Sequence, residues 1–199
     1  DYNITAELTS TTRVGFHRYT FPKTDSAYIS FHTGAFLAHG EVDSSYITKV
    51  NNHEIAGYSL LGKTRRRPKA TYVYFVARIN QEIQEFGGWE NNNFPEPVMT
   101  VYGKNNGAYL RINSQGKPIL MKVAISYTSI ENARLNLETE AGNTTFDEVK
   151  NAASKKWNDM LSKIKVEDEN ETNKTKFYTG LYHALLGRGL ASDVNGQYK

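Results

Sequence analysis

The stretch KVAISYTSIENARLNLETE, residues Lys122–Glu140, contains the change of pattern that decides the fold of this chain. Its first residues have the composition of a β-strand. From Ser129 onward, Ile130, Ala133 and Leu137 recur at the three- to four-residue spacing of one helix face. Strands therefore come first and helices follow, without strand–helix alternation. This order excludes a parallel doubly wound sheet and favours a β-domain followed by a helical element.

The part of the chain before Ser129 is predicted to form short strands separated by turn residues. Ala70–Ile79 (ATYVYFVARI) is the most strongly β stretch, and because it shows little polar alternation we expect both of its faces to be covered. Asn51-Asn52 marks a hairpin turn. Strands that recur every 10 to 15 residues or so predict an antiparallel β-sandwich. The expected strands are Tyr2–Leu8, Arg13–Phe21, Ala27–His32, Glu41–Val50, Glu54–Leu60, Ala70–Ile79, Val98–Tyr102, Ala108–Ile112 and Ile119–Ser126.

The rest of the chain is predicted to be helical. Thr145–Ile164 is the clearest helix, and Thr145 with Glu148 forms a capping box at its start. A last helix is expected to begin near Asn173. Its apolar stripe requires a partner surface. The predicted division is residues 1–128 as the sandwich, 129–169 as a helical connector, and 170–199 as the first helix and loop of a further domain.

Composition excludes several classes of protein. The net charge of +3 is too small to indicate a nucleic-acid partner, and the basic run Arg65–Lys69 is expected to be a solvated loop. The chain has no cysteine, which rules out disulfides, thiolate nucleophiles and cysteine metal sites. No apolar run approaches the roughly 20 residues of a membrane span. No signal peptide is recognisable, and since Asp1 is not a natural start, we expect a processed or truncated N-terminus.

The titratable residues do not form a recognisable catalytic or metal-binding motif. Glycine-rich phosphate loops, nucleophile elbows and His-Glu-x-x-His are absent from the sequence, and the five histidines are not spaced as metal ligands on one element. The acidic clusters lie at expected helix ends or in a polar connector, where the helix dipole explains those at helix starts. We therefore assign none of them as catalytic, although a glycosidase needs two carboxyl groups.

The segment Gln81–Pro97 (QEIQEFGGWENNNFPEP) is the best candidate for a functional site. It is predicted to be a long loop at one end of the sandwich, and long ordered loops are often functional. Gly87-Gly88 would allow close approach of another group. Trp89 offers a flat apolar face for a sugar ring and an N–H for a hydroxyl. The alternative is that Trp89 plugs the end of the sandwich.

Two other residues have structural explanations. Trp157 lies on the apolar stripe of a predicted helix and is expected in the core or at a domain interface. Asp193, in the sequence SDVNG, is expected to form a turn.

Four segments, in order and spacing, resemble glycoside hydrolase family 92. They are RVGFHRYTFP, KVAISYTSIENARLNLE, FDEVKNAASKKWNDMLSKIKVE and FYTGLYHALL followed by SDVNGQY. The resemblance extends from about Ala6 to Tyr198. The family consists of calcium-dependent, exo-acting α-mannosidases. One departure is Gly187-Arg188-Gly189, where the family usually has a proline.

The resemblance implies a fold and the placement of the site. The sandwich would be a galactose-mutarotase-like supersandwich, and the connector would lead to a missing (α/α)6 barrel, so that 170–199 begin a truncated catalytic domain. Catalytic carboxyl groups and calcium ligands would lie downstream, leaving no catalytic residue and no bound metal in this chain. Gly87, Gly88 and Trp89 would help form the site for the sugar on the leaving side. Asp193 would be a weaker binding candidate, and His183 would pack between domains.

The function implied for the intact enzyme is the hydrolysis of terminal α-mannosides of glycans with inversion, whereas this portion alone would be inactive. The expected partners are a mannose-containing glycan and the catalytic domain of the same polypeptide. A bacterial periplasmic, cell-surface or secreted enzyme of N-glycan degradation fits this resemblance. Two alternatives stay open: an accessory domain of another glycosidase or phosphorylase with a helical barrel, and a free-standing carbohydrate-binding module. The helices after Ser129 argue against the second alternative.

Overall fold

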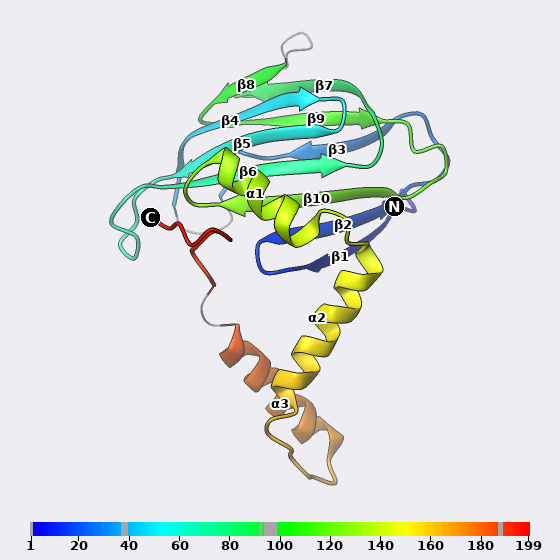
Figure 1. The fold of residues 1–199 in the computed structure, drawn as a ribbon, viewed down its shortest axis with the longest axis vertical. Coiled ribbons are helices and arrows are strands. Elements are labelled where there is room, and N and C mark those ends of the chain that lie inside the picture. The colour runs from blue at the N-terminus through cyan, green and yellow to red at the C-terminus, as the bar shows by residue number, and fades with distance from the viewer. Residues whose placement is uncertain (1, 37–39, 92, 94–98, 187–188) are drawn as a thin grey trace.

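The computed structural model describes residues 2–36, 40–91, 93, 99–186 and 189–199, and its ribbon is drawn in Figure 1. The order of elements is strands first and helices last. The strands are β1 (Thr5–Ser10), β2 (Val14–Thr20), β3 (Ala27–Phe31), β4 (Val42–Asn51), β5 (Glu54–Leu61), β6 (Thr71–Ile79), β7 (Ile83–Glu90), β8 (Thr100–Gly103), β9 (Asn106–Ile112) and β10 (Ile119–Ser126). The helices are α1 (Ile130–Ala141), α2 (Phe146–Leu161) and α3 (Glu171–Leu185).

The strands form two antiparallel sheets that pack face to face. The larger sheet has seven strands in the order β1-β2-β10-β6-β5-β4-β8, and the smaller has three in the order β3-β9-β7. Every paired neighbour runs antiparallel. The predicted fold class, an antiparallel β-sandwich followed by helices, is therefore confirmed.

The centre of the larger sheet is completed by its last strand. β10 lies between β2 and β6, with Val123 opposite Gly15 on one side and Ala77 on the other. This insertion joins the N-terminal hairpin β1–β2 to the meander β4–β5–β6. The predicted hairpin turn at Asn51-Asn52 is confirmed, since Asn51 pairs with Glu54 where β4 and β5 meet.

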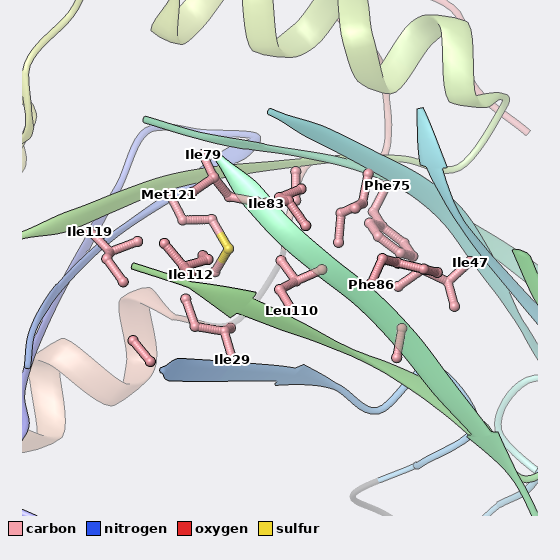
Figure 2. Packing of buried hydrophobic residues seen from close by; sticks show 14 of the residues in the cluster. Ile29, Ile47, Phe75, Ile79, Ile83, Phe86, Leu110, Ile112, Ile119 and Met121 are labelled. Atoms are coloured by element: carbon pink, nitrogen blue, oxygen red, sulfur yellow. The ribbon is translucent and has the colours of Figure 1, made fainter. Parts of the chain in front are cut away.

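The main core lies between the two sheets. Alternate residues of the strands point into it, as expected where one face of each strand is buried. Figure 2 shows these side chains, which include Ile47 and Phe75 of the larger sheet and Phe86 and Leu110 of the smaller. The cluster also contains Ala27, Ile29, Ile55, Ala77, Ile79, Ile83, Val101, Ala108, Ile112, Ile119 and Met121.

A second apolar cluster forms where α1 crosses the outer face of the larger sheet. The face of α1 formed by Ala133, Leu137 and Ala141 packs on Val76 of β6 and Ala124 of β10. The small alanines let the helix approach the sheet closely. β6 therefore buries Phe75 towards the other sheet and Val76 towards α1, which confirms that both of its faces are covered.

The two remaining helices extend away from the sheets (Figure 1). The capping box of Thr145 and Glu148 is present, but α2 ends at Leu161, three residues before the predicted end. Only Phe146 and Val149 of α2 are buried, and no residue of α3 is. Exposed apolar side chains of this helical arm are Met160, Ile164, Phe177, Tyr182, Leu185 and Leu186. Within the described residues, no helix is long and apolar enough to cross a membrane.

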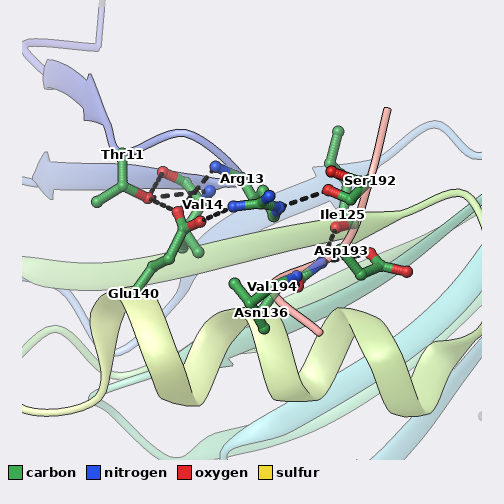
Figure 3. Close-up of polar contacts among 9 residues, drawn as sticks. All are labelled: Thr11, Arg13, Val14, Ile125, Asn136, Glu140, Ser192, Asp193 and Val194. Carbon is green, nitrogen blue, oxygen red and sulfur yellow. Dashed lines mark hydrogen bonds and ion pairs between the residues drawn. The ribbon is translucent and has the colours of Figure 1, made fainter. Parts of the chain in front are cut away.

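A polar cluster fixes α1 and the C-terminal segment to the sandwich (Figure 3). Glu140 accepts hydrogen bonds from the Thr11 hydroxyl at 2.6 Å, the Arg13 backbone N–H at 2.9 Å and the Arg13 guanidinium at 2.5 Å. The same guanidinium donates through Nε to the carbonyl oxygen of Ser192 at 2.6 Å. Burial alone would raise the pKa of Glu140, but these hydrogen bonds outweigh burial and lower the pKa.

This cluster makes the stability of the chain depend on pH. Because the pKa of Glu140 is lower in the folded chain than the ordinary value of 4.5, its stabilisation is present above that value and is lost as pH falls through the folded pKa. We expect Glu140→Gln to lower the free energy of unfolding at pH 7 by roughly 1–3 kcal/mol, since it removes a charged acceptor from Arg13. The drop in stability below about pH 4.5 should be correspondingly shallower in this variant.

Urea unfolding followed by circular dichroism between pH 3 and pH 7 measures both effects. Glu138→Gln is the matched control, because Glu138 is on the same helix but its side chain is 50% exposed, against 14% for Glu140. Its exposed ion pair with Arg78 should contribute at most about 1 kcal/mol. A Glu140→Gln curve that runs parallel to the wild-type curve at every pH would contradict the assigned role.

Candidate functional site

The segment that contains Trp89 is a strand for most of its described length. The prediction that Gln81–Pro97 is a long loop is wrong for residues 83–90, which form β7 and pair with β9. A β-bulge between Ile83 and Glu85 explains the error. The extra residue places Ile83 and Phe86 on the same face although they are three residues apart, so the strand lacks the usual alternation. Residues 92 and 94–97 of the expected loop lie outside the described residues.

Neighbouring side chains lie so close to Gly87 and Gly88 that a Cβ atom at either position would clash with them. A Cβ atom at Gly88 would lie 2.2 Å from the Val101 side chain inside the sandwich, and one at Gly87 would lie 2.3 Å from the Tyr109 ring on the outer face. The close approach that the two glycines allow is therefore made by protein groups. Their role in substrate binding stays a prediction.

Trp89 lies on the outer side of the three-stranded sheet. Gly88 faces the core, so Trp89 points the other way, and its indole crosses Gly107 on β9, where a Cβ atom would be 2.3 Å from the ring. The His32 ring packs beside the indole, with centroids 4.7 Å apart and planes inclined by 59°. The side chain is half-buried at the end of β7. The binding role of Trp89 and the alternative that it plugs the end of the sandwich both stay predictions.

A buried polar cluster of Asn106, Ser45 and Thr33 lies next to Gly107 at this end of the sandwich. Asn106, which is 1% exposed, accepts hydrogen bonds through its side-chain oxygen from the hydroxyl groups of Ser45 and Thr33. Its amide nitrogen donates to the Ser45 carbonyl at 3.3 Å, and its backbone carbonyl accepts from the Gly34 N–H at 2.8 Å. Asn106 thereby joins β4, the chain after β3 and β9 directly beside Gly107. Asn106 lies between two strands expected from the sequence, and nothing local indicates these distant partners.

An open pocket of about 400 Å³ lies at the same end of the molecule. Asn91, two residues after Trp89, lines it, and its backbone N–H donates to the Asn105 carbonyl at 2.9 Å. The rim carries the exposed ion pair of Lys104 and Glu41 at 2.9 Å, in which Lys104 lowers the pKa of Glu41. The pocket therefore offers polar groups close in sequence to Trp89. Its other lining residues are Gly34, Phe36, Gly40 and Val42.

Among the described residues, the carboxyl groups with a clear pKa shift all have a lowered pKa. A general acid needs a raised pKa. The hydrogen bond from Arg111 lowers the pKa of Glu85, and the pKa of Glu140 is also lowered. Among the described residues, no three His, Asp or Glu side chains gather in a group that could hold a metal ion.

Asp193 is a structural residue at the junction of the C-terminal segment and α1. The carboxylate is 3% exposed and accepts hydrogen bonds from Thr128 at 2.5 Å, Asn136 at 2.7 Å and Ser126 at 2.9 Å. Burial alone would raise the pKa of Asp193, but these hydrogen bonds outweigh burial and lower it. The turn predicted here is present, since the Gly196 N–H donates to the Asp193 carbonyl at 2.9 Å. Its weaker candidacy for ligand binding stays a prediction.

The aromatic residues of the helical arm lie on α2 and α3, outside the two sheets. Trp157 of α2 is half-buried and packs against Tyr182 of α3, with ring centroids 4.7 Å apart. His183 is exposed on α3 beside Tyr182. Trp157 thus serves the contact between the two helices, and the packing of His183 against another domain stays a prediction. Residues 187 and 188, in the expected departure from the family pattern, lie outside the described residues.

Comparison with known families gives two adjacent matches. The glycosyl hydrolase family 92 N-terminal domain matches residues 1–126, and the catalytic domain of the same family matches residues 132–199. The chain belongs to glycoside hydrolase family 92. The gap between the matches, residues 127–131, runs from the end of β10 into the first turn of α1. The finer division at residues 128 and 169 stays a prediction.

Solved structures of family 92 members share this fold. The α-mannosidase BT3965 from Bacteroides thetaiotaomicron superposes with a TM-score of 0.88 at 28% identity, covering 100% of this chain and 27% of that protein. The complex of BT3965 with mannoimidazole superposes with a TM-score of 0.87 at 28% identity, covering 100% of this chain and 26% of that protein. The inverting mannosidase BT2199 from Bacteroides thetaiotaomicron superposes with a TM-score of 0.84 at 20% identity, covering 97% of this chain and 26% of that protein. The chain thus spans about a quarter of these proteins. A comparison with curated protein sequences found no match.

The polar cluster around Asn106 can be tested by substitution. Asn106→Ala leaves the Ser45 and Thr33 hydroxyl groups without their acceptor in a buried place, so the free energy of unfolding should fall by roughly 1–3 kcal/mol. The neighbour Asn105→Ala is the matched control, because Asn105 is exposed and its structural hydrogen bond uses the backbone. Chemical denaturation measures the difference. Equal stability of the two variants would show that the cluster does not hold this end of the sandwich.

Proposed function

We propose that the intact enzyme hydrolyses terminal α-mannosides of glycans with inversion and depends on calcium. In this proposal the present chain supplies the β-domain, the connector and the beginning of the catalytic domain, and Trp89 forms part of the wall of the sugar-binding cleft. The observation that carries it is the position of Trp89 on the outer side of the small sheet, in a family 92 chain. The α-mannosidase BT3965, which is 28% identical to this chain, has been solved in complex with mannoimidazole, and this complex supports mannose as the ligand.

The surroundings of Trp89 suit the binding of a neutral sugar. The indole crosses a glycine and is held from one side by His32, so its orientation is largely set before a ligand arrives. A preset ring loses little conformational freedom on binding. The polar pocket near Asn91 supplies amide groups that can hydrogen-bond hydroxyls. The site is therefore suited to the leaving-side sugar.

The helical arm supports a role as a connector. Its apolar side chains, among them Phe177 and Leu185, are exposed in the described structure, and several exposed apolar side chains on one arm fit a contact with further protein. Because the family 92 catalytic-domain match includes the arm itself, the rest of that domain is the expected cover.

The chemistry of inversion requires one carboxylic acid to protonate the leaving oxygen and one carboxylate to activate water, roughly 6.5–9.5 Å apart. The lowered pKa values of Glu85 and Glu140 argue against either residue as the acid. We therefore place the pair in the part of the catalytic domain outside this chain, and we place the calcium ligands there too.

The other functional readings are less well supported. Membership of family 92 argues against an accessory domain of another glycosidase or phosphorylase family. A free-standing carbohydrate-binding module would not need three helices that match a catalytic domain. Within this proposal we place the enzyme in a bacterial periplasm, on the cell surface or outside the cell, acting in N-glycan degradation.

The mechanism is tested by hydrolysis of p-nitrophenyl α-mannoside. We expect the intact enzyme to release mannose with inverted anomeric configuration, which proton NMR measures. A calcium chelator should abolish the activity until calcium is restored. The 199-residue chain alone should show no hydrolysis, because the proposal places the catalytic carboxyl groups outside it. Retained configuration, activity after chelation or hydrolysis by the short chain would each contradict the proposal.

The role of Trp89 is tested in the same enzyme. Trp89→Ala should reduce kcat/KM on an α-mannobioside about tenfold, equivalent to roughly 1.4 kcal/mol, since it removes the stacking surface. Trp89→Phe keeps an aromatic face and should recover part of the loss. Trp157→Phe is the control, because Trp157 serves the contact between α2 and α3. Unchanged kinetics in Trp89→Ala would exclude this residue from the cleft.

A further inference from the structure

The outer face of the three-stranded sheet presents three cross-strand rows. Trp89 is opposite Gly107, and Tyr109 is opposite Gly87 in the next row. The third row contains Tyr28, Arg111 and Glu85, taken across β3, β9 and β7. Because each row is two residues further along the strands, the face extends about 14 Å from the first row to the third.

Two glycines let aromatic rings lie down on this face. Tyr109 covers Gly87 and Trp89 covers Gly107, so their rings approach the backbone of the neighbouring strand to distances that a Cβ atom would prevent. Such pairs also protect the backbone at a glycine, which is a purely structural use. Tyr28 has no glycine opposite it, because its partner on β9 is Arg111. Its side chain is 55% exposed, and protection of a glycine does not explain it.

The polar groups of the face are fixed and electrically balanced. Arg111 donates through Nε to Glu85 at 2.9 Å and through Nη1 to Gln84 at 3.0 Å, while the Tyr109 hydroxyl donates to Glu85 at 3.2 Å. The Tyr28 ring lies 6.1 Å from the Tyr109 ring, at an inclination of 56°. Since Arg111 and Glu85 neutralise each other, this pair offers hydrogen-bonding groups without net charge. That chemistry suits a neutral ligand rich in hydroxyl groups better than an acidic one.

The helices leave this face accessible. α1 packs on β2, β5, β6 and β10 of the larger sheet, and α2 packs on β1 and β2. The face is continuous with Trp89, since Trp89 and Tyr109 occupy adjacent rows. A glycan whose first leaving-side sugar lies against Trp89 can therefore extend along the strands towards Tyr28.

We propose that Tyr109 and Tyr28, with Arg111 and Glu85 between them, form an extended binding surface for the further sugars of a neutral, mannose-containing glycan. This surface rests on the function proposed above and adds to it a preference for long substrates. Short aryl mannosides would not reach it. The surface would therefore affect the use of oligosaccharides without affecting the chemistry of bond cleavage.

The test compares two substrates in the intact enzyme. Tyr28→Ala and Tyr109→Ala should each reduce kcat/KM on a linear mannotetraose about two- to tenfold, the range expected for one aromatic contact. Both should leave kcat/KM on p-nitrophenyl α-mannoside within about twofold of the unaltered enzyme. Tyr102→Ala is the matched control, because Tyr102 is 60% exposed but belongs to β8 of the larger sheet. It should change neither value.

Each alternative outcome has a separate meaning. Unchanged kinetics on mannotetraose in both tyrosine variants would overturn the surface. An equal loss on both substrates would also overturn it, because that result indicates a structural or domain contact. If the unaltered enzyme does not cleave the aryl mannoside, the proposed function fails instead. Titration calorimetry with mannotetraose then decides the surface by itself: weaker binding to Tyr28→Ala than to Tyr102→Ala supports it, and equal binding overturns it.

Discussion

The contact between α1 and the larger sheet is the constraint on which the arrangement of the whole chain depends. The apolar part of this contact, with Ala133, Leu137 and Ala141 against β6 and β10, buries the outer face of the sheet. The polar part, at Glu140 and Asn136, ties the helix to the β1–β2 turn and to the segment after α3. One helix thus sets where the arm of α2 and α3 leaves the sandwich and where the chain returns to it.

The return of the chain is held by two kinds of interaction that reinforce each other. Arg13 reaches both Glu140 and the carbonyl of Ser192, and Asp193 occupies the hydrogen-bonding groups of Thr128 and Asn136. These groups are buried or half-buried, so loss of one partner would leave another unsatisfied. A family 92 enzyme built on this scaffold would have its β-domain fixed against the start of its catalytic domain by these contacts. A rigid connection of this kind suits the proposed sugar-binding cleft, whose walls would come from both domains.

The sequence predicted those elements whose signals are local. Thr145 and Glu148 lie in one helical turn, so their capping box could be recognised directly, and β10 has the same bounds as its prediction. β7 was missed because a bulge between Ile83 and Glu85 disturbs its alternation and because Gly87 and Gly88 resemble a loop. Those glycines are explained by rings and side chains on other strands. Of the candidate site, Trp89 could be selected from its residue type, whereas its partners His32, Gly107 and Asn106 come together only through sheet pairing.

The insertion of β10 between β2 and β6 also has a consequence for the synthesis of the chain on the ribosome. The β1–β2 hairpin emerges first and the β4–β5–β6 meander follows, but neither edge that flanks the gap can be paired until residue 126 has left the exit tunnel. Until then the nascent chain exposes two open strand edges, which invite pairing with other chains. The closing step is also a long-range one, and such steps are slow. The time before β10 emerges is therefore the stage at which these two edges are open to pairing with other chains.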